Sequence, residues 1–221
     1  MYRHVFFLLF LGGQFALSAT TPQSAAPLRS AASLWGNRYY RGRRFVIKIK
    51  TRTMNLENIN DHLEAYKNHD QIIDAAEFII STFGLEHDNF AGFGFRPELE
   101  PDRMLLTAEG EVGGRQMVMI PKNLFDFDLN LVVNMLAHEM LHVRQKAPEN
   151  VVEDKNEREF QAYYEMLFHK VFPNVPEVSD FHKKFFGGKA LEYYKRMGEG
   201  SELQTKYAEQ KLEVEGLINA L

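Results

Sequence analysis

The stretch that decides the fold is Asp128–Gln145, with the sequence DLNLVVNMLAHEMLHVRQ. Its apolar residues recur at helical spacing, Asp128 or Asn130 can cap its first turn, and Pro148 follows shortly after its end. The pattern therefore predicts a single helix that ends at about Gln145. In the middle of this helix, surrounded by apolar residues, lies the pentad His-Glu-Met-Leu-His.

The pentad has the spacing of a metal site. His138 and His142 are four residues apart, so on a helix their Cβ atoms lie about 5–6 Å apart and both imidazoles can bind one ion. Glu139 lies about 100° further round the helix, which places its carboxylate beside the ion and within reach of a metal-bound water. The alternative interpretation is a solvated polar face. We favour the metal, because apolar neighbours surround these side chains and burying them without partners is costly.

The choice of further ligands is limited, because the chain contains no cysteine. This excludes disulfides, thiolate ligands and a cysteine nucleophile, so a metal site must use His and carboxylates. A catalytic zinc ion usually has three protein ligands and a water. Four acidic residues downstream are candidates for the third ligand: Glu153, Glu157, Glu159 and Glu165.

With this pentad on a helix, the chain resembles the zincin metallopeptidases. The string NEREFQAY, from Asn156 to Tyr163, is similar to the Glu-aromatic-x-Ala helix that supplies the third ligand in several gluzincins. By that resemblance Glu159 is the ligand, and its helix is also apolar on a broad side. Glu157 is expected to be solvated. The gluzincin pattern often has Asp where this chain has Tyr163.

The resemblance implies an α+β, zincin-like fold, with a small sheet, an active-site helix and a following helix that carries the third ligand. It also implies zinc-dependent hydrolysis of a peptide or protein substrate. His138, His142 and Glu159 would bind Zn²⁺, and Glu139 would be the general base. The alternative is a non-catalytic, zinc-stabilised protein-binding domain. Glu139 argues against it, because a structural zinc site needs no base and is normally closed by a fourth protein ligand.

Three further residues are candidates for stabilising the transition state: Tyr163, His169 and His182. Tyr163 would lie one helical turn after Glu159 and on the same face. Ordinary packing or surface roles explain each of the three as well, so none is chosen.

Outside the pentad helix, the pattern predicts two helical segments and one hairpin. A helix capped by Asn58 or Asn60 is expected to break near Asn68 and end at Phe83-Gly84, and another is expected over Asp154–Lys170. Further predictions are a loop at Phe90–Pro101, hairpin strands at Arg103–Ala108 and Arg115–Ile120, and an amphipathic tail at Ser201–Ala220. The resemblance also implies a substrate cleft between the sheet and the metal helix, bordered by the second hairpin strand. Its edge either binds an extended peptide or is purely structural.

The N-terminal region differs in charge from the rest. The first 56 residues contain nine of the 26 basic residues and none of the 30 acidic ones, so the remainder carries 17 basic against 30 acidic residues, a net charge of −13. An acidic domain lacks the basic face that binding to a phosphate backbone requires, which excludes nucleic acid as an expected partner.

The same region suggests export. Basic residues precede a short apolar run, and small residues follow at Ala16-Leu17-Ser18. We expect a signal peptide at 1–18, a basic linker or leader at 19–56 with a marginal strand at Phe45–Lys50, and a metallopeptidase-like domain at 57–221. The protein would be secreted or periplasmic, with no stable membrane span after cleavage. An organelle transit peptide and a translation start at Met54, which implies a cytoplasmic protein, remain open alternatives.

Overall fold

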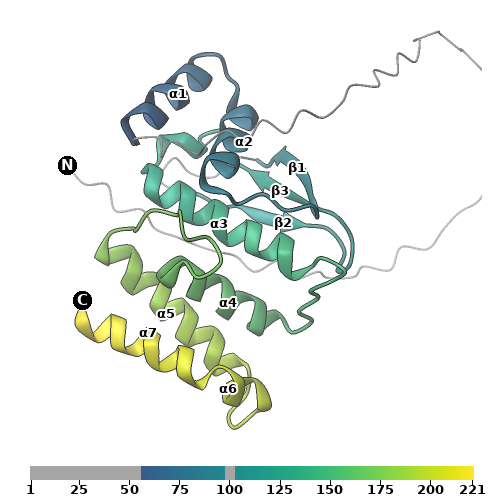
Figure 1. Ribbon diagram of the computed structural model, residues 1–221, viewed down its shortest axis with the longest axis vertical. Helices are drawn as coiled ribbons and strands as arrows, with labels where there is room; N and C mark the ends of the chain where they lie inside the picture. The colour runs from purple at the N-terminus through teal and green to yellow at the C-terminus, as the bar shows by residue number, and fades with distance from the viewer. Residues whose placement is uncertain (1–55, 98–102) are drawn as a thin grey trace, which may run out of the picture. The chain divides into compact units, whose positions relative to one another are not determined.

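The computed structural model describes residues 56–97 and 103–221, which belong to one unit of the chain (Figure 1). The expected signal peptide at 1–18, the basic linker at 19–56 except its last residue, and the strand at Phe45–Lys50 lie outside these residues. Within the described part, no helix is long and apolar enough to cross a membrane.

Two helices open the described chain. Helix α1 spans Leu56–Asn68 and α2 spans Ile72–Phe83. The break between them was predicted. The predicted cap at Asn58 or Asn60 was wrong, because α1 already begins at Leu56. Gly84 ends α2 with a left-handed φ of 68°, a conformation that glycine adopts without steric cost.

A three-stranded sheet follows, with β1 at Phe90–Phe95, β2 at Thr107–Glu109 and β3 at Gln116–Ile120. The order is β1-β3-β2, with β3 parallel to β1 and antiparallel to β2. The hairpin was predicted. Its first strand is shorter than expected, since Met104–Leu106 is buried but has no strand pairing.

The prediction of a loop at Phe90–Pro101 was wrong for its first half, which forms β1. The sequence FAGFGF shows no alternation because Gly92 and Gly94 take two of the side-chain positions. The Met119 side chain on β3 packs over position 94, since a Cβ there would lie 2.8 Å from its sulfur and would force that side chain to move. The strand is therefore specified by its parallel partner, which lies more than 20 residues away in the sequence.

The position of β3 corrects a second expectation. Both of its edges are paired within the sheet, so it has no edge left to bind an extended peptide. The edge strands are β1 and β2.

Helix α3, Leu129–Gln145, is the central element and is buried on nearly every side. A short 3-10 turn, η1 at Leu124–Asp126, precedes it, and the Asp128 carboxylate caps it by accepting a hydrogen bond from Leu131 N at 3.1 Å. One side of α3 packs against α2 and the sheet, and another packs against α4 (Figure 1). Any polar residue in its middle is thereby enclosed between two layers.

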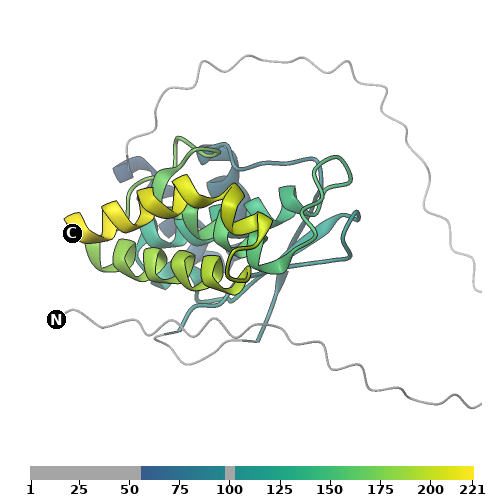
Figure 2. The ribbon, with the colours of Figure 1, turned by 90° about the horizontal axis from the view of Figure 1, so that it is seen from below.

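Helices form the other layer. Helix α4 spans Lys155–Phe168, α5 spans Asp180–Arg196, α6 spans Glu202–Lys206 and α7 spans Ala208–Ala220. Helix α4 packs against α3 and α5, and α7 lies along α5 (Figures 1 and 2). The fold is thus mixed α and β, mostly helical with one small sheet, as predicted.

Candidate metal centre

Three side chains from two helices meet at one point. His138 and His142 come from successive turns of α3, and their Nε2 atoms lie 3.1 Å apart. Glu159 comes from the second turn of α4, with its two carboxylate oxygens 3.7 Å from His138 Nε2 and 3.8 Å from His142 Nε2. The structure therefore brings together all three residues that the sequence analysis named as metal ligands.

This arrangement fits a metal ion. Two ligands that each lie about 2.1 Å from a tetrahedral zinc ion are about 3.4 Å apart. The distance between the two Nε2 atoms and the distance from each of them to its nearer Glu159 oxygen are close to this value. One ligand atom from each of the three residues lies within 4.8 Å of the other two. Two imidazoles and a carboxylate suit zinc and also other divalent transition metals, so the donor set indicates a metal without identifying it.

The charges in the cluster support one another. Burial tends to raise the pKa of Glu159, but its ion-pair contacts with His138 and His142 outweigh burial and hold that pKa well below the usual range. Burial also tends to lower the pKa of His142, but its contact with Glu159 outweighs burial and the pKa is raised. An ionised carboxylate is the state that binds a cation, whereas the proton that the raised pKa favours on His142 must leave before the ring can bind a metal.

Behind His142 lies a residue that the sequence analysis missed, Gln145. Its Oε1 atom is 2.7 Å from His142 Nδ1, and its Nε2 atom donates to Arg158 O at 3.0 Å and to Gln161 Oε1 at 2.7 Å. Because both amide hydrogens of Gln145 are directed at other acceptors, its oxygen is the atom that faces His142, and an amide oxygen can only accept. The proton of the neutral His142 ring therefore lies on Nδ1, and Nε2 keeps its lone pair for a metal. The spacing of three residues after His142 was the signal that could have identified it.

The two imidazoles differ in this support. In the part of the chain that the structure describes, His138 Nδ1 is buried without a hydrogen-bond partner. The ring of His138 packs instead against the ring of Tyr163, with centroids 4.8 Å apart and planes at 66°. His142 is thus oriented by hydrogen bonding and His138 by packing.

Glu139 lies beside the cluster and is only 3% exposed. Its Oε2 atom accepts a hydrogen bond of 2.7 Å from Ala108 N on β2, and Lys146 Nζ donates to the carbonyl of the same residue at 2.7 Å. Burial is the largest influence on Glu139 and raises its pKa, against the opposing charges of His138 and His142. The contacts of Ala108 and Lys146 depend on how β2 meets α3, which no sequence pattern indicated.

Of the three candidates for transition-state stabilisation, only Tyr163 touches the cluster. It is buried, and burial followed by the charge of Glu159 raises its pKa, so it keeps its proton. His169 pairs through Nε2 with Asn134 Oδ1 at 3.1 Å, and His182 pairs with Ser179. Neither histidine belongs to the cluster.

The other acidic candidates have different surroundings. Glu153 is exposed, and Glu165 accepts hydrogen bonds from Val171 N and Phe172 N, which hold the turn after α4. Glu157 was expected to be solvated, which was wrong. It is 7% exposed and bonded to Lys206 and Tyr207, because the C-terminal segment folds back over α4.

Comparisons with protein-family models, with curated proteins and with solved structures find no match for this chain.

Proposed function

We propose that this chain is a zincin-like, zinc-dependent peptidase. The observation that carries the proposal is the position of Glu139, a buried carboxylate next to a cluster of three ligands but not part of it. Three protein ligands leave a coordination position for water or substrate, which is the pattern of catalytic rather than structural zinc sites. A buried carboxylate with a raised pKa beside such a position suits a general base.

The protein residues divide the work of the reaction. A zinc ion held by His138, His142 and Glu159 would polarise the scissile carbonyl and acidify a water molecule. Glu139 takes the proton of the attacking water on its carboxylate and delivers it to the leaving nitrogen. Its short bond to Ala108 N fixes the carboxylate against β2, so that the base is already oriented before substrate binds.

The same strand lies at one edge of the sheet. The N–H and C=O groups of Ala108 are bonded to Glu139 and Lys146 of α3 and its C-cap, so they face away from β3, on the open edge of the sheet. Both main-chain groups of Ala108 are already hydrogen-bonded within the chain, so an extended peptide could pair with them only by displacing Glu139 or Lys146. The proposed substrate class therefore rests on the resemblance to zincins and not on a free strand edge.

The experiment compares the full chain with two variants, Glu139→Gln and His138→Ala. We expect about one zinc ion per chain and turnover of casein by the wild type. Glu139→Gln should keep the metal and lose about 10²–10⁴-fold in turnover, the usual contribution of a general base. His138→Ala should lose both metal and turnover.

Two results would contradict the proposal. If Glu139→Gln loses zinc as completely as His138→Ala, Glu139 is a ligand and not the base. If the zinc-loaded wild type cleaves neither casein nor a mixed peptide library, the centre is the non-catalytic zinc-stabilised site.

A further inference from the structure

A chain of hydrogen bonds leads from the candidate metal centre to the C-terminal helices. Beyond Gln145, the next residue is Gln161 of α4, whose Nε2 atom donates to the hydroxyl of Tyr207. That hydroxyl donates to Glu157 Oε1 at 2.6 Å, and Lys206 Nζ donates to the same oxygen at 2.7 Å. The path is largely buried, since Gln145 is 3% exposed and Tyr207 is 8% exposed.

The direction of each bond is determined by the next one. The Tyr207 proton is directed at a carboxylate that can only accept, so the hydroxyl oxygen must accept from Gln161. Gln161 then presents its carbonyl oxygen to Gln145, which in turn presents its own to His142 Nδ1. Burial and then the bond to Glu157 raise the pKa of Tyr207, so the phenol keeps the proton that sets this direction.

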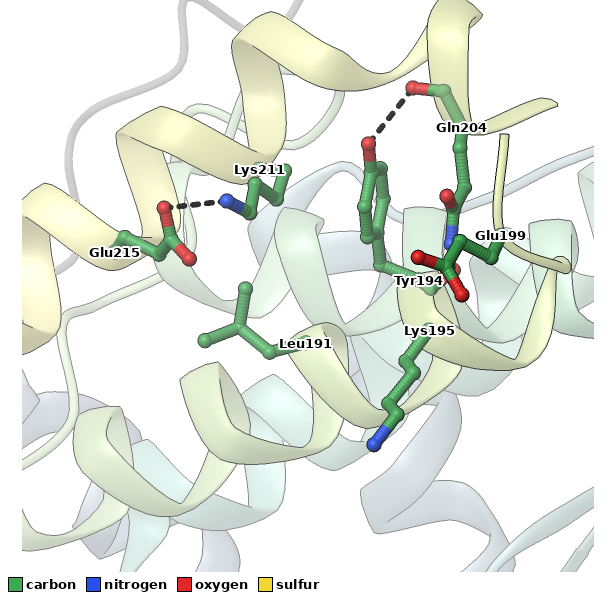
Figure 3. Close-up of a pocket in the computed structure, with 7 residues that line it drawn as sticks. All are labelled: Leu191, Tyr194, Lys195, Glu199, Gln204, Lys211 and Glu215. Atoms are coloured by element: carbon green, nitrogen blue, oxygen red, sulfur yellow. Dashed lines mark hydrogen bonds and ion pairs between the residues drawn. The ribbon is translucent and has the colours of Figure 1, made fainter. Parts of the chain in front are cut away.

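The position of Tyr207 depends on α6. Tyr194 of α5 donates through its hydroxyl to Gln204 O at 2.9 Å, and Gln204 Nε2 donates back to Tyr194 O at 3.0 Å. Figure 3 shows these two residues in the pocket between α5 and the C-terminal helices. The ring of Tyr207 lies 5.2 Å from that of Phe160, which seats it against α4.

We propose that Tyr207 is a positioning residue of the metal centre, acting through Gln161 and Gln145 to hold His142 in its metal-binding tautomer and orientation. The inference rests on the proposed function only in requiring that the cluster binds a metal. By this inference, the C-terminal segment from Ser201 onward supports a metal ligand as well as packing against the core. Without the Tyr207 hydroxyl, the Gln161 amide loses what fixes its orientation, and a reversed amide would place its NH₂ group against that of Gln145.

The test measures zinc affinity of the full chain by competition with a chromophoric chelator. Loss of a residue that directly supports a ligand typically costs about 10–100-fold in metal affinity, which we expect for Gln145→Leu. Tyr207→Phe acts two residues further away, and we expect a smaller loss of roughly 5-fold, below that range. With Co²⁺ in place of zinc, both variants should shift the visible absorption bands, because the geometry of one imidazole ligand changes.

The chain offers a matched control. Tyr164→Phe also removes a hydroxyl from a bond to a carboxylate, that of Glu213, and that bond also joins α4 to the C-terminal segment. The hydrogen bonds of Gln161 go instead to Gln145 and Tyr207. If Tyr207 serves only to hold the C-terminal helices in place, Tyr164→Phe should weaken zinc binding equally, and the proposal is then wrong.

A double variant tests whether the residues act in series. If Tyr207 acts through Gln145, adding Tyr207→Phe to Gln145→Leu should weaken zinc binding no further. Fully additive losses, or wild-type affinity and spectrum in Tyr207→Phe, overturn the proposal. A wild type that binds zinc but cleaves no peptide contradicts the proposed peptidase and leaves this inference standing. A wild type that binds no metal overturns both.

Discussion

At the scale of single residues, the four acidic candidates show what local sequence can and cannot resolve. Glu159 was identified by its resemblance to a known ligand pattern and by its apolar neighbours, and the structure places it against both histidines. The burial of Glu157 could not be predicted, because its partners Lys206 and Tyr207 lie about 50 residues further along the chain. Glu157 becomes buried only when the C-terminal segment folds over α4.

The first prediction concerns the third ligand. Glu159→Gln keeps the size of the side chain but removes the charge that binds a cation, so we expect the dissociation constant for zinc to rise by about 100-fold, at least the effect of losing a supporting residue. Glu153→Gln, an exposed site before α4, is the control and should bind zinc as the wild type does. Equal losses in the two variants would show that general charge, and not ligation, determines the affinity.

At the scale of elements, the helices and strands that local sequence specifies could be predicted, and those that depend on partners far along the chain could not. The pentad helix carries its own cap at Asp128 and its own apolar pattern, and it formed within the predicted bounds. The strand β1 has neither, and it exists through pairing with β3. The sequence alone therefore located the ligands on their helices, but not the strand order that places Ala108 beside Glu139.

The second prediction belongs to the scale of elements and concerns the contact of α5 with α7. Two adjacent glycines in α5 differ in surroundings: a Cβ on Gly187 would lie 2.6 Å from Ile218 Cδ1 on α7, whereas one on Gly188 would meet nothing within 4 Å. Alanine is favoured over glycine in a helix by about 1 kcal/mol, so Gly188→Ala should raise the free energy of unfolding by about that amount.

Gly187→Ala gains the same helix propensity but must push Ile218 away, and overpacking a core contact typically costs about 1–3 kcal/mol. We therefore expect it to be less stable than Gly188→Ala by roughly 1–3 kcal/mol in urea-induced unfolding. Equal stabilisation by both substitutions would mean that α7 does not pack closely against α5 in solution.

At the scale of the whole molecule, the candidate centre joins two layers of the fold. His138 and His142 belong to α3, which packs on the sheet, and Glu159 belongs to α4, which packs on the C-terminal helices. Their ligand atoms come together only when these layers are assembled, since the loop between Gln145 and Lys155 separates them in the chain. A metal that binds here binds the folded state and very little of the unfolded one.

Metal binding should therefore raise thermal stability by mass action. At a free zinc concentration 100 times the dissociation constant, the folded state gains about 2.7 kcal/mol. For a protein of this size each kcal/mol shifts the melting temperature by about 2–4 °C, so the midpoint should rise by about 5–10 °C and fall again with a chelator. Glu139→Gln, which keeps all three ligands, should show the full shift, and His138→Ala should show almost none. A shift of equal size in His138→Ala would place the stabilising metal at another site, because removing one of three ligands cannot leave the affinity of this one unchanged.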